Sequence, residues 1–197
     1  MQNLTYAAHF RPQIRKEAML YDIILIIGAS IFIALSAQFA FNIPFSPVPV
    51  TGQTFAVLLT GALLGSRRGS LAVLAYLLEG VSGLPVYAQA QFGLVHLFGP
   101  TGGYLAGFVP AAFLTGYLVE NGWGKSIFSV LAIMIVGTVV IFICGLSALK
   151  LFFGNNNVFV IGLYPYLTGA VIKIALSAIV FRSGWRVINN YGKDEAE

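Results

Sequence analysis

The stretch LPVYAQAQFGLVHLFGPTGGYLAGF, residues 84–108, is rich in Gly, Pro and aromatic residues, and the segments on either side of it are almost purely aliphatic. It contains five aromatic residues, two glutamines, one histidine and the run Pro-Thr-Gly-Gly. A packed apolar helix has no use for this composition, whereas a loop that binds or covers a ligand does. The contrast predicts apolar helices joined by a loop that helps to close a small-molecule pocket at one face of the protein.

The composition of the whole chain indicates a lipid environment. Of the 197 residues, 58% are hydrophobic and only 9% are charged, against roughly a quarter charged in soluble domains. A soluble fold of this length cannot hide so much apolar surface, so we predict an all-α, polytopic membrane protein with a single domain over residues 1–197. The single cysteine, Cys144, excludes a disulfide framework, and we interpret it as a small buried hydrophobic residue.

Six apolar segments predict a bundle of six transmembrane helices. Residues 19–41 can cross the ~30 Å apolar core as one helix. This run is longer than the apolar part of a signal peptide, so we expect it to be retained as the first helix. The other predicted helices are residues 54–65, 71–78, 103–119, 126–153 and 167–185.

The second and third apolar segments are shorter than the ~20 residues of a typical span. A re-entrant hairpin is the alternative, but it would place Arg67 and Arg68 within the membrane at a cost of several kcal/mol. We therefore interpret these segments as two short crossings that borrow residues from their flanks. Residues 42–54, which contain three prolines, are predicted to form a loop, and residues 158–169 a loop or a partial turn.

The basic residues predict the orientation of the bundle. Six crossings place nine of the eleven Lys and Arg residues on the side that carries both termini, and only Lys150 on the other side, with Lys173 inside the sixth helix. Because basic residues are retained in the cytoplasm, the tails 1–18 and 186–197 are predicted to be cytoplasmic and the protein to lie in the cell membrane. The basic residues follow this topological pattern and form no nucleic-acid-binding cluster, so we expect no nucleic acid partner.

Lys173 is the one ionisable residue well inside a predicted span. It lies about one turn from the outer end of the sixth helix, and no carboxylate is within reach along that helix. Either it binds an anionic ligand, or its side chain snorkels to the membrane interface. Gln53, with Thr51, opens the second helix, and it either binds a polar ligand group or caps the helix.

Further candidate ligand contacts lie on the central loop and at the start of the fourth helix. The tyrosines stack on a ligand or anchor the protein at the interface, and the glutamines bind a ligand or are solvated. These candidates are Tyr87, Gln89, Gln91, Thr101 and Tyr104. Glu79 and Glu120 are expected at helix ends, in reach of headgroups or water, and we assign them no chemistry.

Catalytic and nucleotide-binding motifs are absent from the sequence. Residues 122–126, GWGKS, end like a phosphate-binding loop, but Val119 replaces the first glycine of that pattern and a helix precedes it. The sequence has no Ser/His/Asp set, HExxH motif or paired-carboxylate relay. We therefore expect no enzyme activity, no cofactor and no metal site, and a purely structural scaffold would not need the Gly-, Pro- and Tyr-rich loops.

Several motifs together closely resemble one family. LGSRRG at 64–69, GLPVY at 83–87 and GPTGGY at 99–104 are similar to the biotin-uptake S-component (BioY) family of energy-coupling-factor (ECF) transporters, and the resemblance covers most of the chain. It implies a six-helix bundle that binds biotin from outside and delivers it inward with a transmembrane coupling subunit and two ATPase subunits. It also implies that small residues on the first helix contact the coupling subunit, for which the candidates are Ser30, Ala34 and Ala37. Gly61-x-x-x-Gly65 and Gly103-x-x-x-Gly107 predict further close contacts, within the bundle or with a partner subunit.

The sequence departs from the family pattern at one position. The family's sixth helix typically opens with P-F-x-x-G-D-x-x-K, whose Asp and Lys belong to the ligand site, whereas residues 165–173 here read PYLTGAVIK. Lys173 is kept, and Ala170 replaces the Asp, which removes an acceptor suited to the ureido N–H groups of biotin. We expect a compensating acceptor (Gln53, Gln89 or Gln91), weaker binding or an altered ligand. Biotin remains the expected ligand, and another small vitamin or a biotin analogue is the alternative.

Overall fold

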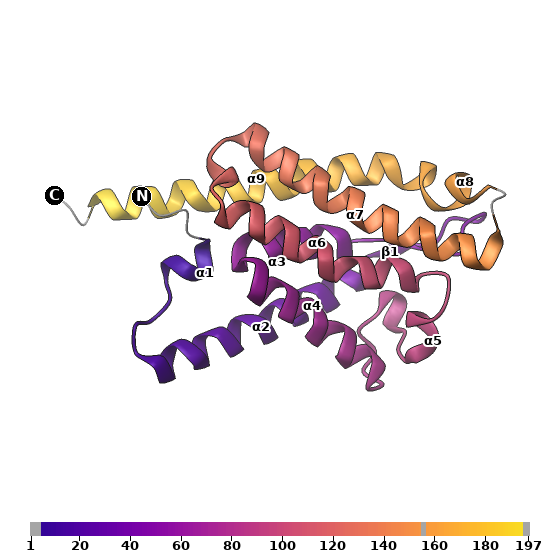
Figure 1. Cartoon of the computed structure of the whole chain (residues 1–197), viewed down its shortest axis with the longest axis horizontal. Coiled ribbons are helices and arrows are strands. Elements are labelled where there is room, and N and C mark those ends of the chain that lie inside the picture. Colours follow the sequence, from indigo (N-terminus) through magenta and orange to yellow (C-terminus); the bar gives the residue numbers. More distant parts are fainter. Residues whose placement is uncertain (1–4, 155–156, 195–197) are drawn as a thin grey trace.

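The computed structural model describes residues 5–154 and 157–194, with side chains up to residue 184. Among these residues, six helices have twelve residues or more and form an elongated bundle (Figure 1). They are α2 (Arg15–Gln38), α3 (Gln53–Leu64), α4 (Ser66–Val81), α6 (Gly102–Glu120), α7 (Ile127–Phe153) and α9 (Tyr164–Asp194). The shorter elements are α1 (Tyr6–His9), β1 (Ala40–Phe41), β2 (Val50–Thr51), η1 (Ala88–Ala90), α5 (Leu94–Leu97), η2 (Trp123–Lys125) and α8 (Val158–Gly162).

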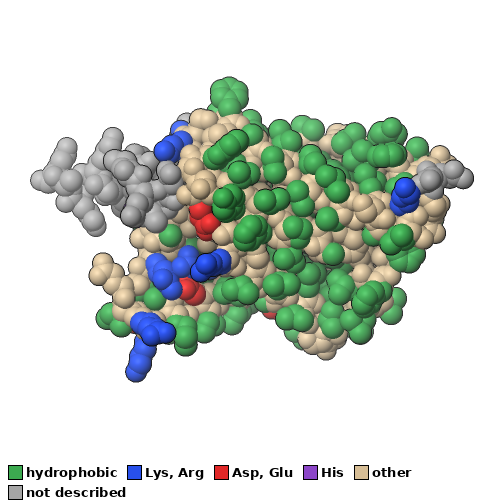
Figure 2. Space-filling view, viewed as in Figure 1, with side chains coloured by type: hydrophobic (Ala, Val, Ile, Leu, Met, Phe, Trp, Pro, Cys, Tyr) green, Lys and Arg blue, Asp and Glu red, His purple; other side chains and the backbone are tan. Residues whose placement is uncertain are grey.

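The helices have the lengths and surfaces of a membrane protein. Four helical segments are long and apolar enough to cross a bilayer, Arg15–Gln38, Gly102–Glu120, Ile127–Phe153 and Val158–Gly184, and α3 is a shorter apolar helix. Hydrophobic side chains cover the flank of the bundle, and most of the visible Lys and Arg side chains gather at one end (Figure 2). The predicted all-α membrane fold is confirmed, while the number of crossings and their orientation stay predictions.

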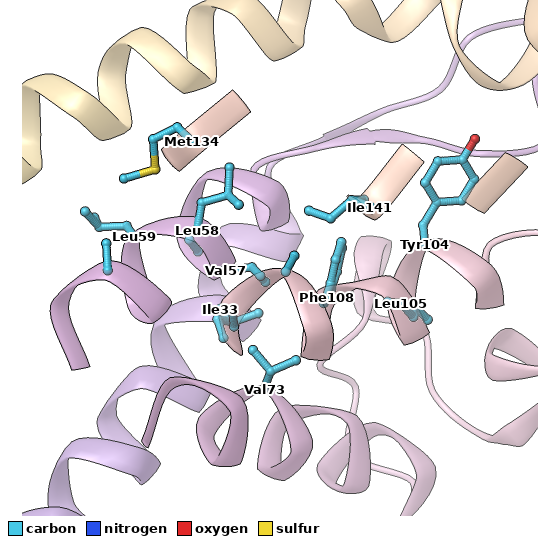
Figure 3. Packing of buried hydrophobic residues seen from close by; sticks show 14 of the residues in the cluster. Ile33, Val57, Leu58, Leu59, Val73, Tyr104, Leu105, Phe108, Met134 and Ile141 are labelled. Carbon is cyan, nitrogen blue, oxygen red and sulfur yellow. The ribbon is translucent and has the colours of Figure 1, made fainter. Parts of the chain in front are cut away.

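The centre of the bundle is built around α6, which packs against α3, α4 and α7. Phe108 of α6 lies among Val57 of α3, Val73 of α4 and Ile141 of α7, and all four side chains are almost completely buried (Figure 3). Burial of this kind gives no hydrophobic gain relative to lipid, so close packing and hydrogen bonds must hold these helices together.

Glycines allow that packing. A methyl group added to Gly61 would lie 2.4 Å from the carbonyl oxygen of Ala112, and one added to Gly103 would lie 2.5 Å from that of Cys144. These contacts join α3 to α6 and α6 to α7, so the two glycine motifs serve packing within the bundle. Cys144 itself is half-buried at the α6–α7 contact.

The pair α3 and α4 is tighter than the sequence predicted. A single residue, Gly65, joins the two helices, and its φ of 90° is a conformation that suits glycine. Arg67 and Arg68 lie in the first turn of α4, so the predicted third helix, residues 71–78, was too short. Glu120 of α6 stabilises this early start, because its carboxylate accepts from the Ser66 amide at 2.8 Å and from the Ser66 hydroxyl at 2.7 Å.

The last helix is longer than predicted at both ends. α9 begins at Tyr164 rather than at residue 167, because Pro165 occupies its first turn, where no intrahelical N–H bond is lost. It continues to Asp194, so residues 186–194 of the predicted tail are helical. Part of the predicted loop 158–169 forms α8, and residues 155–156 and 195–197 lie outside the described residues.

The N-terminal segment and the first loop also differ from the prediction. Residues 5–9 of the predicted tail 1–18 pack on the bundle, where the Tyr6 hydroxyl donates to the Phe181 carbonyl, and α2 begins at Arg15 rather than at residue 19. The loop after α2 is closed at its base by a two-residue antiparallel pair, in which Ala40 faces Thr51 and Phe41 faces Val50. The three prolines between these strands exclude a longer ladder.

Candidate functional site

A cavity opens between α3, α6, α7 and α9, at the end of the bundle where α5 and α8 lie (Figure 1). It holds about 840 Å³ of space between protein atoms, part of it open to solvent. Leu58, Phe108 and Ile141 form apolar walls. Six of the eight ligand contacts predicted from the sequence line it: Thr51, Gln53, Gln91, Thr101, Tyr104 and Lys173.

Lys173 is the only charged side chain among the described residues that line this cavity. It is half-buried on α9, and Ala170, one turn earlier on the same helix, also faces the cavity. The two ion pairs of the described part of the chain, Arg11–Asp22 and Arg68–Asp22, involve other residues. The cavity therefore carries an ammonium group without a protein carboxylate beside it, in surroundings where an anion would be strongly attracted.

Gln53 presents an amide whose orientation is fixed. The Thr51 hydroxyl donates to Gln53 Oε1 at 2.9 Å, and Gln53 Nε2 donates to the Tyr76 hydroxyl. These bonds leave one acceptor position on Oε1 and one hydrogen on Nε2. Thr51 Oγ1 also accepts from the Gln53 amide N–H at 3.3 Å, while the N-cap residue of α3 is Gly52, so the Gln53 side chain does not cap the helix. Tyr76 was missed by the sequence analysis, because only the packing of α3 on α4 brings its hydroxyl to Gln53.

Two segments beside the cavity are joined by hydrogen bonds. The Ser46 hydroxyl, in the loop between β1 and β2, donates to the Ile161 carbonyl at 2.7 Å and lies 2.6 Å from the Tyr166 hydroxyl. Tyr166 in turn donates to the carbonyl of Val48. Because Val48 and Tyr166 both line the cavity, this Ser46–Tyr166 clasp ties the β1–β2 loop to the α8–α9 corner along the cavity wall.

One tyrosine and one threonine that line the cavity also hold α8 and α5 in place. The Tyr104 hydroxyl, on α6, donates to the Gly162 carbonyl at 2.7 Å and so fixes the end of α8. The Thr101 hydroxyl donates to the His96 carbonyl at 3.2 Å, which ties the start of α6 to α5. Both residues therefore line the cavity and also stabilise the segments that surround it.

Two predicted ligand contacts lie outside the cavity. Tyr87 is buried, its hydroxyl donates to the Leu77 carbonyl at 2.8 Å, and burial raises the pKa of its phenol. Gln89 is exposed, with a φ of 59°. Tyr87 is therefore an anchor for the central loop rather than a ligand or interface residue. Gln38 of α2, which the sequence analysis missed, holds the same loop by donating to the Tyr87 carbonyl at 3.2 Å and accepting from the Ala90 amide at 2.9 Å.

Known proteins are similar to this chain in both sequence and fold. A model described as the BioY family matches residues 9–190. The chain belongs to the BioY family. Relatives include a probable biotin transporter BioY from Pyrococcus horikoshii, 35% identical over 77% of this chain and 90% of the relative, and a biotin transporter BioY from Thermotoga maritima, 38% identical over 79% and 92%.

A biotin transporter BioY from Rhizobium etli is 37% identical over 79% of this chain and 87% of its own length. The fold is that of a solved structure described as the S-component for biotin from an ECF-type ABC transporter, with a TM-score of 0.79. The two structures align over 89% of this chain and 95% of the other at 24% identity. The resemblance seen in the sequence motifs is therefore confirmed.

In this BioY-family chain, the three small residues of α2 predicted to contact a coupling subunit do not form an exposed face. Ser30 and Ala37 are completely buried inside the bundle and Ala34 is half-buried, because this side of α2 packs on α3 and α4. The Ser30 hydroxyl donates to a carboxylate oxygen of Glu79 at 2.7 Å. Glu79 is thus bonded across the α2–α4 contact instead of reaching only headgroups or water. The exposed face of α2 carries larger residues such as Ile31.

Proposed function

We propose that this chain is the substrate-binding membrane subunit of a biotin uptake system. It binds biotin from the outer side of the cell membrane and delivers it inward with an ECF transmembrane coupling subunit and two ATPase subunits. It is a transport protein rather than an enzyme, and biotin is its transported ligand rather than a cofactor. The observation that carries this proposal is the cavity beside the outer loops, with Lys173 and Gln53 in its wall, in a chain whose relatives are named biotin transporters.

The chemistry of the cavity suits the two ends of biotin. The ammonium of Lys173 lacks a carboxylate neighbour among the described residues, so it attracts the ligand's carboxylate. The free acceptor and donor positions of the Gln53 amide complement an N–H and the carbonyl of the ureido group. The apolar side chains between them cover the bicyclic ring. Gln53 then compensates for Ala170, and Gln91 at the mouth is the second possible acceptor, whereas Gln89 lies outside the cavity.

Titration calorimetry of the detergent-purified chain is the direct test. We expect biotin to bind with high affinity and a panel of other small vitamins, tested in competition, to leave that binding unchanged. Displacement of biotin by a lower concentration of another vitamin would instead identify an altered ligand. Ala170, which lines the cavity where the family pattern has an Asp, would then be the residue that explains the change. Absence of biotin binding by the folded protein would contradict the proposal.

The clasp beside the cavity makes a kinetic prediction. In Ser46→Ala, the bond to the Ile161 carbonyl is lost, together with the bond within the loop that Ser46 accepts from the Val48 amide at 3.2 Å. We expect biotin to dissociate about fivefold faster, the effect of the one lost hydrogen bond of ~1 kcal/mol that joins the loop to α8. Release of labelled biotin after dilution measures the rate. Ser82→Ala is the matched control, because Ser82 bonds only to the Leu78 carbonyl of its own helix. Equal release rates in both variants would mean that the clasp does not retain the ligand.

The proposed orientation rests on the charges at the two ends of the bundle. Arg11 lies just before α2, Arg15 and Arg67 lie in the first turns of α2 and α4, and Lys125 follows α6. These parts of the chain meet at the end of the bundle where the last turns of α9 also lie (Figure 1). Lys150 lies near the other end of α7. We place the basic end in the cytoplasm, since basic residues are retained there, and the cavity toward the outside.

A further inference from the structure

We infer that the basic end of the bundle binds the headgroup of one anionic phospholipid in a second cavity, formed between the α1–α2 connection and the first turns of α2. Arg11, Gln13, Arg15, Met19 and Asp22 are among its lining residues. This second cavity is formed by other elements than the proposed biotin site, and the inference does not depend on what the biotin site binds.

The second cavity is built around a carboxylate shared by two arginines. Arg11 Nη2 lies 2.8 Å from Asp22 Oδ2 and Arg11 Nε lies 3.3 Å from Oδ1, while Arg68 Nε of α4 lies 2.6 Å from Oδ1. One negative charge thus holds two guanidinium groups in place. A guanidinium carries five N–H donors, so Arg11, which lines the cavity, keeps donors that these bonds do not use, whereas Arg68 holds Asp22 from outside the lining. A planar group held in this way suits the oxygens of a phosphate.

The surroundings of the second cavity are strongly basic. Arg15 lines it and makes no described ion pair, and Lys16 is the next residue of α2. Along the connection and the first turns of α2 and α4 lie the basic residues Arg11, Arg15, Lys16, Arg67 and Arg68. The acidic residues of these segments are Glu17 and Asp22, and Glu120 of α6 is bonded to Ser66 at the start of α4. Figure 2 shows basic side chains gathered at this end of the molecule, next to a hydrophobic surface. Basic pockets at membrane helix ends are suited to anionic headgroups.

An apolar surface continues from the second cavity along α2, and it favours a lipid over a free phosphate. Met19 lines the cavity and is 65% exposed. Farther along the helix, Ile23, Ile24 and Ile27 are also exposed. A headgroup held by Arg11 and Arg15 would leave its acyl chains against this face, where a soluble anion would gain nothing.

Native mass spectrometry of the purified full chain tests the inference with phosphatidylglycerol and phosphatidylcholine as probes. We expect phosphatidylglycerol to be retained preferentially. Arg15→Gln should weaken its binding about fivefold and Arg11→Gln/Arg15→Gln about 25-fold, at ~1 kcal/mol for each basic residue near the headgroups. Arg15→Gln leaves both partners of Asp22 in place, so it reports on the site even if the double variant folds poorly.

Lys125→Gln is the matched control, because this exposed residue lies after α6, outside the second cavity. It should keep the full preference for phosphatidylglycerol. Unchanged binding in Arg15→Gln, or an equal loss in Lys125→Gln, would overturn the site in favour of diffuse attraction to the basic end. Displacement of the lipid by glycerol 3-phosphate at the same concentration would overturn the assignment to a lipid, because that probe has no acyl chains.

Discussion

Replacing Lys173 with alanine is expected to weaken biotin binding at least tenfold, which corresponds to about 1.4 kcal/mol. The ammonium lies in a largely apolar cavity without a carboxylate beside it among the described residues, so we expect the ligand to supply its counter-ion. A charge-assisted hydrogen bond in such surroundings is worth roughly 1.5–3 kcal/mol. Calorimetric titration of the purified, folded variant with biotin measures the loss.

Lys150→Ala is the control for this variant. Lys150 is an exposed lysine near the end of α7, and it does not line the cavity. Its removal changes the net charge of the protein by the same amount, so biotin affinity should stay as in the unmodified chain. Wild-type affinity in Lys173→Ala would remove Lys173 from the binding site, and a similar loss in both variants would point to long-range electrostatics.

A large effect on stability is expected for Gly116→Ala. A methyl group at this position of α6 would lie 2.3 Å from the carbonyl carbon of Gly65, 2.4 Å from the Ser66 nitrogen and 2.8 Å from the Gly61 oxygen. All three are backbone atoms of the α3–α4 connection, so no side-chain rotation relieves the clash and α6 must move away. We expect a loss of about 2 kcal/mol, typical of an overpacked core, seen as a lower melting temperature in detergent.

Gly28→Ala provides the matched comparison. Gly28 lies on the exposed face of α2, and an added methyl group would meet no atom within 4 Å. Because alanine also favours a helix over glycine, this variant should melt at the same temperature or slightly higher. A melting temperature for Gly116→Ala equal to that of Gly28→Ala would show that α6 and the α3–α4 connection are not in close contact in the membrane protein.

Much of the fold could be read from single segments of the chain. The glycine-rich start of α6 predicted a helix with nearly the observed bounds. The apolar run near residue 23 predicted a helix at 19–41 where α2 spans Arg15–Gln38. Both helices were found because an apolar segment of sufficient length has few alternatives in lipid. Errors occurred at helix ends. Pro165 and the polar residues after Gly65 were interpreted as loop or turn residues, yet both lie in first turns, where proline is tolerated and where Glu120 supplies partners to Ser66.

The candidate site could be predicted in part. Lys173 was conspicuous because a charge inside an apolar span is costly, and Gln53 because a buried amide needs partners. Tyr87 and Gln89 had the same composition signal but lie outside the cavity. Their loop neighbour Gln91 lies inside it, since a loop that turns at Gln89 sends adjacent side chains in different directions.

The sequence by itself determined that this chain lies in a membrane, that it is helical, that its basic residues concentrate near particular helix ends, and that it resembles the BioY family, because hydrophobicity, charge and local motifs are properties of short segments. Only the tertiary structure decided that Ser30 faces Glu79 instead of the surface, that Tyr76 orients Gln53, and that Asp22 gathers two arginines beside a second cavity. These contacts join residues of different helices or, for Arg11, of the α1–α2 connection and a helix, and the placement of one segment against another sets which side chains meet.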